Sequence, residues 1–301
     1  MNRNALIFLI AAQFLLLSIL LRLGFSVPVD KPAGAAQIHT APTEPPLQTA
    51  KPTISLPDPD NAYIGELYTR MELHALEHEN RSYGPGKTSN GARPPYAVSD
   101  QETYQDFGCN FIAPDNGCIY LTFDCGYEYN NLTNSILDTL QEKDVKAVFF
   151  ITMSYAMKNP DTVKRMIREG HAVGNHSNSH REMPDLTVDE MAWEVMSLHK
   201  YVLENFGYEM TLFRPPTGAF STRSLATVQS LGYKTVHWSF AYADWDTDAQ
   251  PDPVDALHRI TSSHHSGAIY LLHAVSETNA AVLCDAIDFF LAQGYTLSLF
   301  A

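Results

Sequence analysis

Five short clusters of polar residues hold the side chains that could do chemistry, and most of them end or follow an apolar run. The clusters are Asp124-Cys125, His176-Ser-Asn-Ser-His180, Arg214-Pro-Pro-Thr-Gly218, Asp244-Trp245 and Leu272-His273. Carboxylate, imidazole, thiol and guanidinium groups therefore recur at or just after the ends of apolar runs. Buried parallel strands present polar side chains at their carboxyl ends in this way. The pattern predicts a single site at the mouth of an α/β fold.

His176 and His180 have the spacing of a metal-binding pair. Gly174 before them and Pro184 after them favour a loop over a helix. Neutral imidazole nitrogens are good ligands for zinc and similar cations, and two of them in one loop can close on one ion. Histidines at this spacing also occur by chance, so solvated loop histidines remain the alternative.

Asp124 and Cys125 could complete a metal-assisted hydrolase. Such an enzyme needs a base that takes the proton of a water molecule, and a carboxylate at a strand end can be that base. A thiol that a cation ionises can serve as a third ligand. The alternatives are a helix cap for Asp124 and a small buried residue for Cys125.

The remaining clusters supply groups that could orient and complete the reaction. Arg214 can pair with a carboxylate and hold it ionised. The prolines after it leave the Thr217 amide as a possible donor to a developing oxyanion. A hydrogen bond from Asp244 would raise the pKa of His273 and suit it to be a general acid. The alternatives are a surface arginine, a loop acid and a core histidine.

Four apolar or aromatic residues next to these groups are expected to contact the substrate. Trp245 offers a large apolar wall beside Asp244. The other three are Leu272, Pro216 and Tyr127.

Strand-like and helix-like segments alternate from Gly117 onward, which favours parallel strands. Strands are expected at 118–123, 147–151, 171–174, 212–213, 235–239, 268–272 and 297–300. Helices are expected near 133–143, 160–169, 187–206, 221–231, 252–264 and 279–293. Thr187, with Glu190 three residues later, forms a capping box at the start of the third helix. About seven strands with polar carboxyl ends favour a barrel-like α/β arrangement.

Residues 1–60 have the composition of a targeting segment followed by a linker. A basic start precedes an uncharged run from Ala5 to Leu21, a length between those of a secretory signal and a spanning helix. We expect a membrane anchor, with a cleaved signal as the alternative, so the rest would work outside the cytoplasm. The expected parts are a signal or anchor at 1–25, a flexible Pro-rich linker at 26–60, a helical and loop-rich extension at 61–116 and a catalytic domain at 117–301.

The net charge limits the classes of binding partner, and the cysteines raise the question of a disulfide. The formal net charge of −14 argues against nucleic acid as a partner. It suits a neutral or amine-bearing substrate, although it could equally serve solubility alone. Cys109 and Cys118 could form a disulfide in an oxidising compartment, but spacing does not fix pairing. Cys284 lies in a helical pattern and is expected to be a small core residue.

In their order, the five clusters resemble the motifs of the polysaccharide deacetylases (NodB homology, carbohydrate esterase family 4). The resemblance begins at Thr122-Phe-Asp-Cys-Gly126 and covers about residues 119–301. The stretches Thr122–Glu128 and Leu271–Asn279 further resemble the peptidoglycan N-acetylmuramic acid deacetylases that act in δ-lactam formation in spore cortex. The resemblance implies a deformed (β/α) barrel and gives roles to six residues. Asp124 is then the base, His176 and His180 are metal ligands, Arg214 is the partner of Asp124, and His273 is the acid tuned by Asp244.

Two positions depart from the family pattern. Cys125 stands where most members have a second aspartate that binds the metal, an aspartate that the muramic acid type also commonly lacks. The implied divalent-metal site is therefore two histidines and water, with or without a thiolate. A thiolate ligand would favour zinc over magnesium or calcium. Thr217 replaces a common aromatic residue, a change that leaves the backbone amide in place.

With this resemblance, the expected protein is a monomeric hydrolase that removes N-acetyl groups from amino sugars of cell-wall peptidoglycan. One alternative is a deacetylase of another polysaccharide, such as chitin or xylan. Another is a catalytically silent carbohydrate-binding domain in which Cys125 marks the loss of the metal site.

Overall fold

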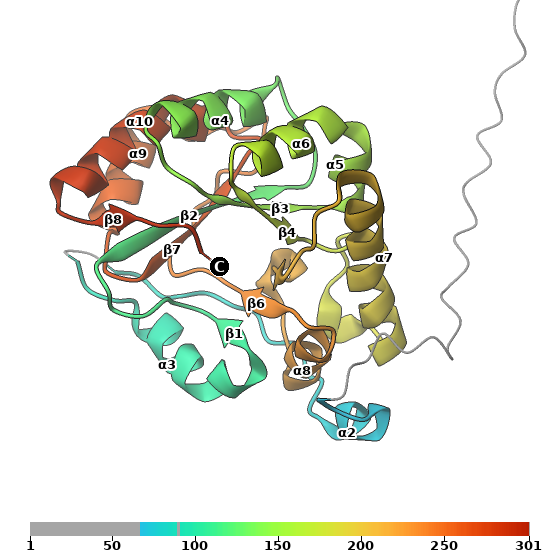
Figure 1. Ribbon diagram of the computed structural model, residues 1–301. Helices are drawn as coiled ribbons and strands as arrows, with labels where there is room; N and C mark the ends of the chain where they lie inside the picture. The colour runs from blue at the N-terminus through green and yellow to red at the C-terminus, as the bar shows by residue number, and fades with distance from the viewer. Residues whose placement is uncertain (1–66, 89–90, 301) are drawn as a thin grey trace, which may run out of the picture. The chain divides into compact units, whose positions relative to one another are not determined.

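One parallel sheet organises the described chain, with strand order β1-β6-β5-β4-β3-β2-β7 and β8 paired to β2. This computed structural model describes residues 67–88 and 91–300 (Figure 1). The strands are β1 (Cys109–Asn110), β2 (Cys118–Cys125), β3 (Val148–Ile151), β4 (Ala172–Asn175), β5 (Leu212–Phe213), β6 (Lys234–Val236), β7 (Ala268–His273) and β8 (Thr296–Leu297). The seven strands expected from the sequence are all present, and β1 is additional.

The sheet curls until its two sides meet. Just beyond β6, the amide of Ser239 donates to the carbonyl of Ile269 at 2.9 Å, and the amide of Leu271 donates to the carbonyl of Phe240 at 2.9 Å. These bonds join the chain after β6 to β7 and close an irregular barrel. The predicted barrel-like arrangement of parallel strands is confirmed.

Residues of the central strands alternate between two buried environments, as the period of two in a strand requires. Val148 and Phe150 lie in a cluster inside the barrel with Tyr120. Phe149 and Ile151 lie in the larger core between the sheet and the helices. Apolar cover on both faces explains why β2 and β3 are almost continuous apolar runs.

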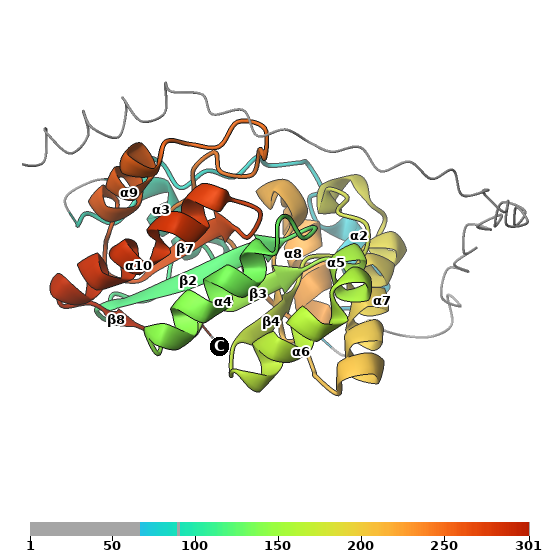
Figure 2. The ribbon, with the colours of Figure 1, turned by 90° about the horizontal axis from the view of Figure 1, so that it is seen from above.

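Helices cover the outside of the sheet (Figures 1 and 2). They are α4 (Leu132–Glu142), α5 (Met153–Lys158), α6 (Pro160–Arg168), α7 (Val188–Phe206), α8 (Thr222–Ser230), α9 (Pro253–Ser262) and α10 (Glu277–Ala292), with short 3₁₀ turns at Met183–Asp185 and Pro216–Gly218. Helix α10 packs against both α4 and α9, and α7 packs against α8. The predicted capping box of Thr187 and Glu190 begins α7, and Gly207, in the left-handed conformation, caps its carboxyl end.

The segment before Gly117 is part of the same fold. It contains α2 (Arg70–Ala75), α3 (Pro95–Tyr104), a 3₁₀ turn (Gln105–Phe107) and β1, which pairs with β6. The Tyr83 hydroxyl also donates to the carbonyl of Trp238 at 2.6 Å. β1 thus joins residues before Gly117 to the sheet, a contact that a strand of two residues leaves no sequence pattern to predict.

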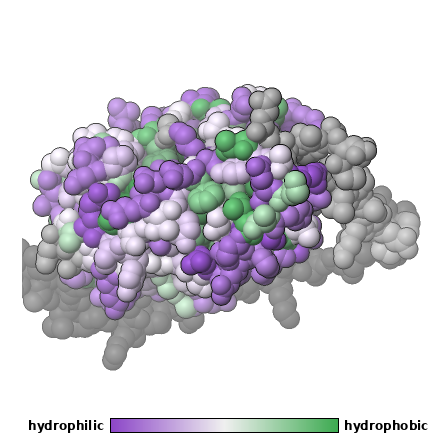
Figure 3. Space-filling view, turned by 90° about the horizontal axis from the view of Figure 1, so that it is seen from below, coloured by the Kyte–Doolittle hydropathy of each residue, from purple (hydrophilic) through white to green (hydrophobic). Residues whose placement is uncertain are grey.

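The predicted anchor at 1–25 and linker at 26–60 lie outside the described residues. Within residues 67–88 and 91–300, no helix has the length and apolar character that a membrane crossing needs. Figure 3 shows one face of this part, on which hydrophilic residues surround smaller hydrophobic patches.

Candidate active site

The carboxyl ends of β2, β4, β5 and β7 bring the predicted groups to one rim. Asp124 and His273 are register partners on the neighbouring strands β2 and β7. His176 directly follows β4, and Arg214 directly follows β5. Because parallel strands end at the same edge, residues far apart in sequence meet here.

Asp124 and Arg214 form a buried ion pair at the base of the site. The Arg214 guanidinium donates from Nη1 to Oδ1 of Asp124 at 2.8 Å. Its other groups donate to the carbonyls of Val236 and His237, both at 3.0 Å. Burial by itself would raise the pKa of Asp124, but Arg214, His176 and His273 together hold that pKa below its ordinary value. Asp124 is thus an oriented carboxylate that remains ionised.

His176 presents an unprotonated nitrogen to the site. Its Nδ1–H donates to the carbonyl of Arg214 at 2.9 Å, which leaves Nε2 as an acceptor 3.5 Å from Oδ2 of Asp124. Burial lowers the pKa of His176 to about 4, so the ring is neutral. The ring of His180 lies 4.9 Å from that of His176, centroid to centroid. The pair lies in a loop, as predicted.

The loop that carries these histidines is braced by residues that the sequence analysis missed. Both oxygens of the buried Glu194, on α7, accept from Ser179, from its amide at 2.7 Å and from its hydroxyl. The Ser177 hydroxyl accepts from the His180 amide at 2.9 Å. Ser177 and His180 have left-handed backbones, with φ of 69° and 60°. The one signal in the sequence that could have pointed to Glu194 is its place among the apolar positions of a helical pattern, where a carboxylate needs a partner.

His273 and Asp244 form the second pair of the rim. Nδ1–H of His273 donates to Oδ1 of Asp244 at 2.7 Å, and the His273 amide donates to Oδ2 at 2.8 Å. Burial opposes protonation of His273, but the hydrogen bond and charge of Asp244 outweigh it and raise the pKa of His273 above its ordinary value. Asn279, also missed, donates to Oδ2 of Asp244 at 2.6 Å and is itself bonded to Tyr242.

Thr217 lies at the exposed tip of the turn after Arg214. Its backbone is left-handed, with φ 58° and ψ −3°. The amides of Gly218 and Ala219 donate to the carbonyls of Pro215 and Pro216. The Thr217 amide has no acceptor in the described part of the chain. It is therefore available to a ligand.

Cys125 does not join this site. Asp124 lies on the barrel side of β2, so Cys125, the next residue, lies on the other side, in the core between sheet and helices. Its side chain is completely buried, and burial raises the pKa of its thiol well above the ordinary value, with smaller contributions from the charges of Asp124 and Glu128. The structure thus contradicts a thiolate ligand at Cys125 and favours the small buried residue.

The four expected substrate contacts divide into two kinds. Trp245 and Tyr127 are exposed, and the Trp245 ring lies 5.8 Å from that of His273. Leu272 is buried in the core beneath the helices, and Pro216 is buried under the Thr217 turn. The prediction of substrate contact for Leu272 is therefore wrong, because alternation along β7 turns that side chain away from the barrel.

At this rim, His176 and His180 are the imidazoles that could hold a cation. Among the described residues, no group of three or more His, Cys, Asp and Glu side chains is arranged to hold a metal ion. The neutral His176, with Nδ1 engaged and Nε2 free, nevertheless has the form of a metal-ligating histidine, and His180 lies beside it. The residues therefore fit a divalent cation held by two nitrogens, with other positions left to water or substrate.

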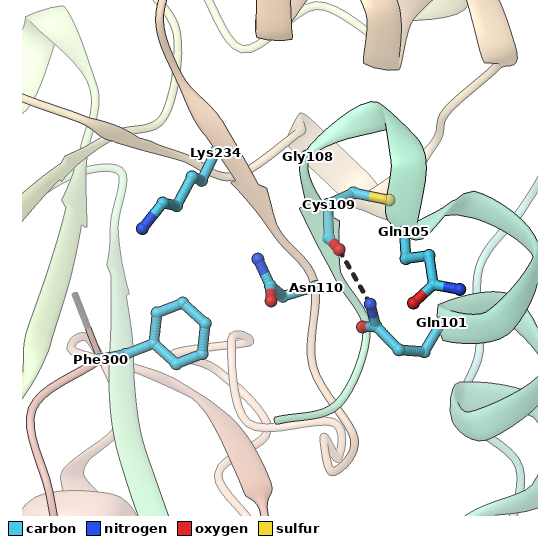
Figure 4. Close-up of a pocket in the computed structure, with 7 residues that line it drawn as sticks. All are labelled: Gln101, Gln105, Gly108, Cys109, Asn110, Lys234 and Phe300. Carbon is cyan, nitrogen blue, oxygen red and sulfur yellow. Dashed lines mark hydrogen bonds between the residues drawn. The ribbon is translucent and has the colours of Figure 1, made fainter. Parts of the chain in front are cut away.

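A separate cavity lies near the amino ends of the strands. It has a volume of about 250 Å³ and is lined by Gln101, Gln105, Gly108, Cys109, Asn110, Lys234 and Phe300 (Figure 4). Lys234 is the first residue of β6, so the cavity is remote from the carboxyl-end rim. Its lining residue Cys109 is a free thiol, as is Cys118, so the suggested disulfide is not formed.

Comparisons with known proteins agree with this geometry. Residues 112–236 match the family described as Polysaccharide deacetylase. The chain is 42% identical over 179 residues to the peptidoglycan-N-acetylmuramic acid deacetylase PdaA of Bacillus subtilis, covering 59% of this chain and 68% of the relative. It is 33% identical over 183 residues to the peptidoglycan-N-acetylglucosamine deacetylase PgdA of Listeria monocytogenes, covering 61% of this chain and 38% of the relative.

Among solved structures, that of Bacillus subtilis PdaA, a family 4 carbohydrate esterase, superimposes with a TM-score of 0.71 and 35% identity. The match covers 74% of this chain and 96% of that one. The chain belongs to the polysaccharide deacetylase family, carbohydrate esterase family 4, and is a polysaccharide deacetylase.

Proposed function

We propose that this deacetylase removes the N-acetyl group of N-acetylmuramic acid in peptidoglycan. The observation that carries the chemistry is the placement of Asp124 and His273 as register partners with opposite charge preferences. Deacetylation of an amide needs both a base for water and an acid for the amine. The choice of sugar is supported by the 42% identity to a muramic acid deacetylase, against 33% to a glucosamine deacetylase.

In the proposed mechanism, four groups act on the acetamide. Asp124, fixed by Arg214, accepts a proton from a water molecule whose oxygen forms a bond to the carbonyl carbon. The Thr217 amide donates a hydrogen bond to the oxyanion that develops on the carbonyl oxygen. Nε2–H of His273 gives its proton to the sugar nitrogen as the carbon–nitrogen bond breaks. Acetate and a free amine are the products.

Enzymes of this family are typically metal-dependent, and we propose zinc at His176 and His180. Imidazole nitrogens suit zinc better than magnesium or calcium. When bound, such a cation lowers the pKa of water and polarises a carbonyl. The unprotonated Nε2 of the neutral His176 and the ring of His180 beside it support that proposal.

The proposed setting is outside the cytoplasm, with the chain as a monomer tethered or exported through residues 1–25. The basic start and the uncharged run that follows it support export. The relatives named above act on peptidoglycan, as their names state. Exposed Trp245 and Tyr127 are proposed to contact the glycan.

Acetate release from purified peptidoglycan tests the proposal. The full chain is incubated with the polymer, with chelator or added zinc, and the muropeptides are analysed by mass spectrometry. Loss of acetyl from muramic acid supports the proposal, whereas loss from glucosamine alone favours the activity named for PgdA. Binding of glycan without acetate release in the presence of zinc would leave only the silent binding domain.

A further inference from the structure

A carboxylate outside the five catalytic clusters holds the turn of Thr217. Glu182 follows His180 by two residues, and its Oε1 accepts from the Thr217 hydroxyl at 3.1 Å. Its Oε2 accepts from the side-chain amide of Asn80 at 2.8 Å. Both oxygens of Glu182 are thus engaged, one by the catalytic turn and one by the amino-terminal extension.

Thr217 needs an outside restraint because of its backbone. A φ of 58° is costly for a β-branched residue, whose side chain clashes in the left-handed region. Glycine would adopt the same conformation at little cost. Gly218 is left-handed as well, and a Cβ there would lie 2.3 Å from the Trp238 ring, so the turn is backed closely by that ring. The surroundings, and not the preference of Thr217, therefore set its conformation.

The conformation of Thr217 decides where its free amide lies. The neighbouring amides of Gly218 and Ala219 are fixed to the carbonyls of Pro215 and Pro216 at 3.0 and 3.3 Å. A change of φ at Thr217 would turn its peptide group relative to these fixed neighbours. Oxyanion donors must be placed before reaction to be effective.

We propose that Glu182, supported by Asn80, is a positioning residue that keeps Thr217 left-handed and its amide directed at the oxyanion. This inference rests on the proposed function, in which the Thr217 amide is the oxyanion donor. Glu182 acts here through Thr217 and does not touch the reacting atoms. Through Asn80, which precedes the matched family region of 112–236, the extension takes part in positioning the catalytic turn.

The first test compares single variants by acetate release. Glu182→Ala is expected to lower kcat by about ten- to a hundredfold, because a displacement of about 1 Å can cost that much. KM should change less than about threefold, since the contact strengthens in the transition state. Thr217→Val, which removes the hydroxyl from the other side of the same bond, should match this loss. Glu182→Gln keeps an acceptor oxygen and should lose less than about threefold, and exposed Asp185→Ala in the same loop is the control.

The second test asks whether Glu182 acts through Thr217. In a Thr217→Gly background the left-handed conformation carries little strain, so adding Glu182→Ala should change kcat by less than about twofold. An equal loss in both backgrounds, or wild-type kcat in Glu182→Ala, would overturn the proposal. A loss confined to the Thr217 background supports it.

A measurement without substrate separates this inference from the proposed function. NMR couplings of the Thr217 amide report its φ in the wild type and in Glu182→Gln and Glu182→Ala. A shift of Thr217 towards negative φ in Glu182→Ala alone supports the positioning role, and an unchanged φ overturns it. Wild-type protein that releases no acetate would refute the proposed function, while this measurement would still decide the role of Glu182.

Discussion

Two histidines on opposite sides of the rim show how the same side chain is given different chemistry. His176 and His273 both donate from Nδ1, but His176 donates to a backbone carbonyl and His273 to a carboxylate. Burial lowers the pKa of His176 to about 4, whereas Asp244 raises the pKa of His273. In the proposed mechanism, the hydrogen-bond acceptor of Nδ1–H thus decides whether Nε2 carries a lone pair for a metal or a proton for a leaving group.

Asp124 lies between these two sides, and its removal should have the largest effect. Asp124→Asn is expected to lower kcat by about a thousandfold or more, because the base is lost. The buried charge of Arg214 would lose its partner, so the free energy of unfolding should fall by about 3 kcal/mol. Acetate release and thermal unfolding measure the two effects. Activity within tenfold of wild type would refute Asp124 as the base.

Metal binding should separate the two histidine sides next. His176→Ala and His180→Ala are each expected to weaken zinc binding roughly a hundredfold, since about 10 to 16 kcal/mol is shared among the ligands of a zinc site. His273→Ala, the matched control, should change zinc affinity by less than about twofold while reducing acetate release. Calorimetric titration with zinc measures all three. If His273→Ala weakened zinc binding as much as His176→Ala does, the assignment of zinc binding to the His176 side alone would be wrong.

The acid side should respond through pH. His273 must be protonated to act as the acid, so activity is expected to fall as pH rises through its raised pKa. Asp244→Asn removes the charge that, with its hydrogen bond, raises the pKa of His273, so this falling limb should move to lower pH and activity at alkaline pH should drop. The dependence of kcat on pH measures the shift. A limb that stays in place in Asp244→Asn would assign it to another group.

Much of this arrangement could be predicted because its signals are local. The apolar run of β2 ends at the rim in the sequence as it does in the fold, and each of the five clusters could be placed relative to its neighbouring strand. The capping box of Thr187 and Glu190 is likewise a pattern of four residues. Short elements such as β1, with two residues, leave no periodicity to detect.

The supporting groups could not be predicted, since packing across the fold supplies them. Glu194 comes from α7, Asn279 from α10 and Glu182 from a loop, and nothing in their local sequence indicates the group that each one holds. The prediction of Cys125 as a metal ligand was wrong for a different reason. Its place beside Asp124 suggested a shared role, but neighbours in a strand face opposite sides, and burial then keeps the thiol protonated.

Replacing Cys125 should have the smallest effect on catalysis and would sharpen the comparison between the two sides. Cys125→Ser is expected to keep kcat and zinc affinity within about twofold of wild type, because the thiol lies across the strand from His176. A hydroxyl in that apolar core should lower the free energy of unfolding by about 1 to 3 kcal/mol. Cys284→Ser, in half-buried α10, is the control for a thiol-to-hydroxyl change. A tenfold loss of zinc affinity in Cys125→Ser alone would mean that the thiol reaches the metal, and the lone-pair side of the rim would then hold three ligands.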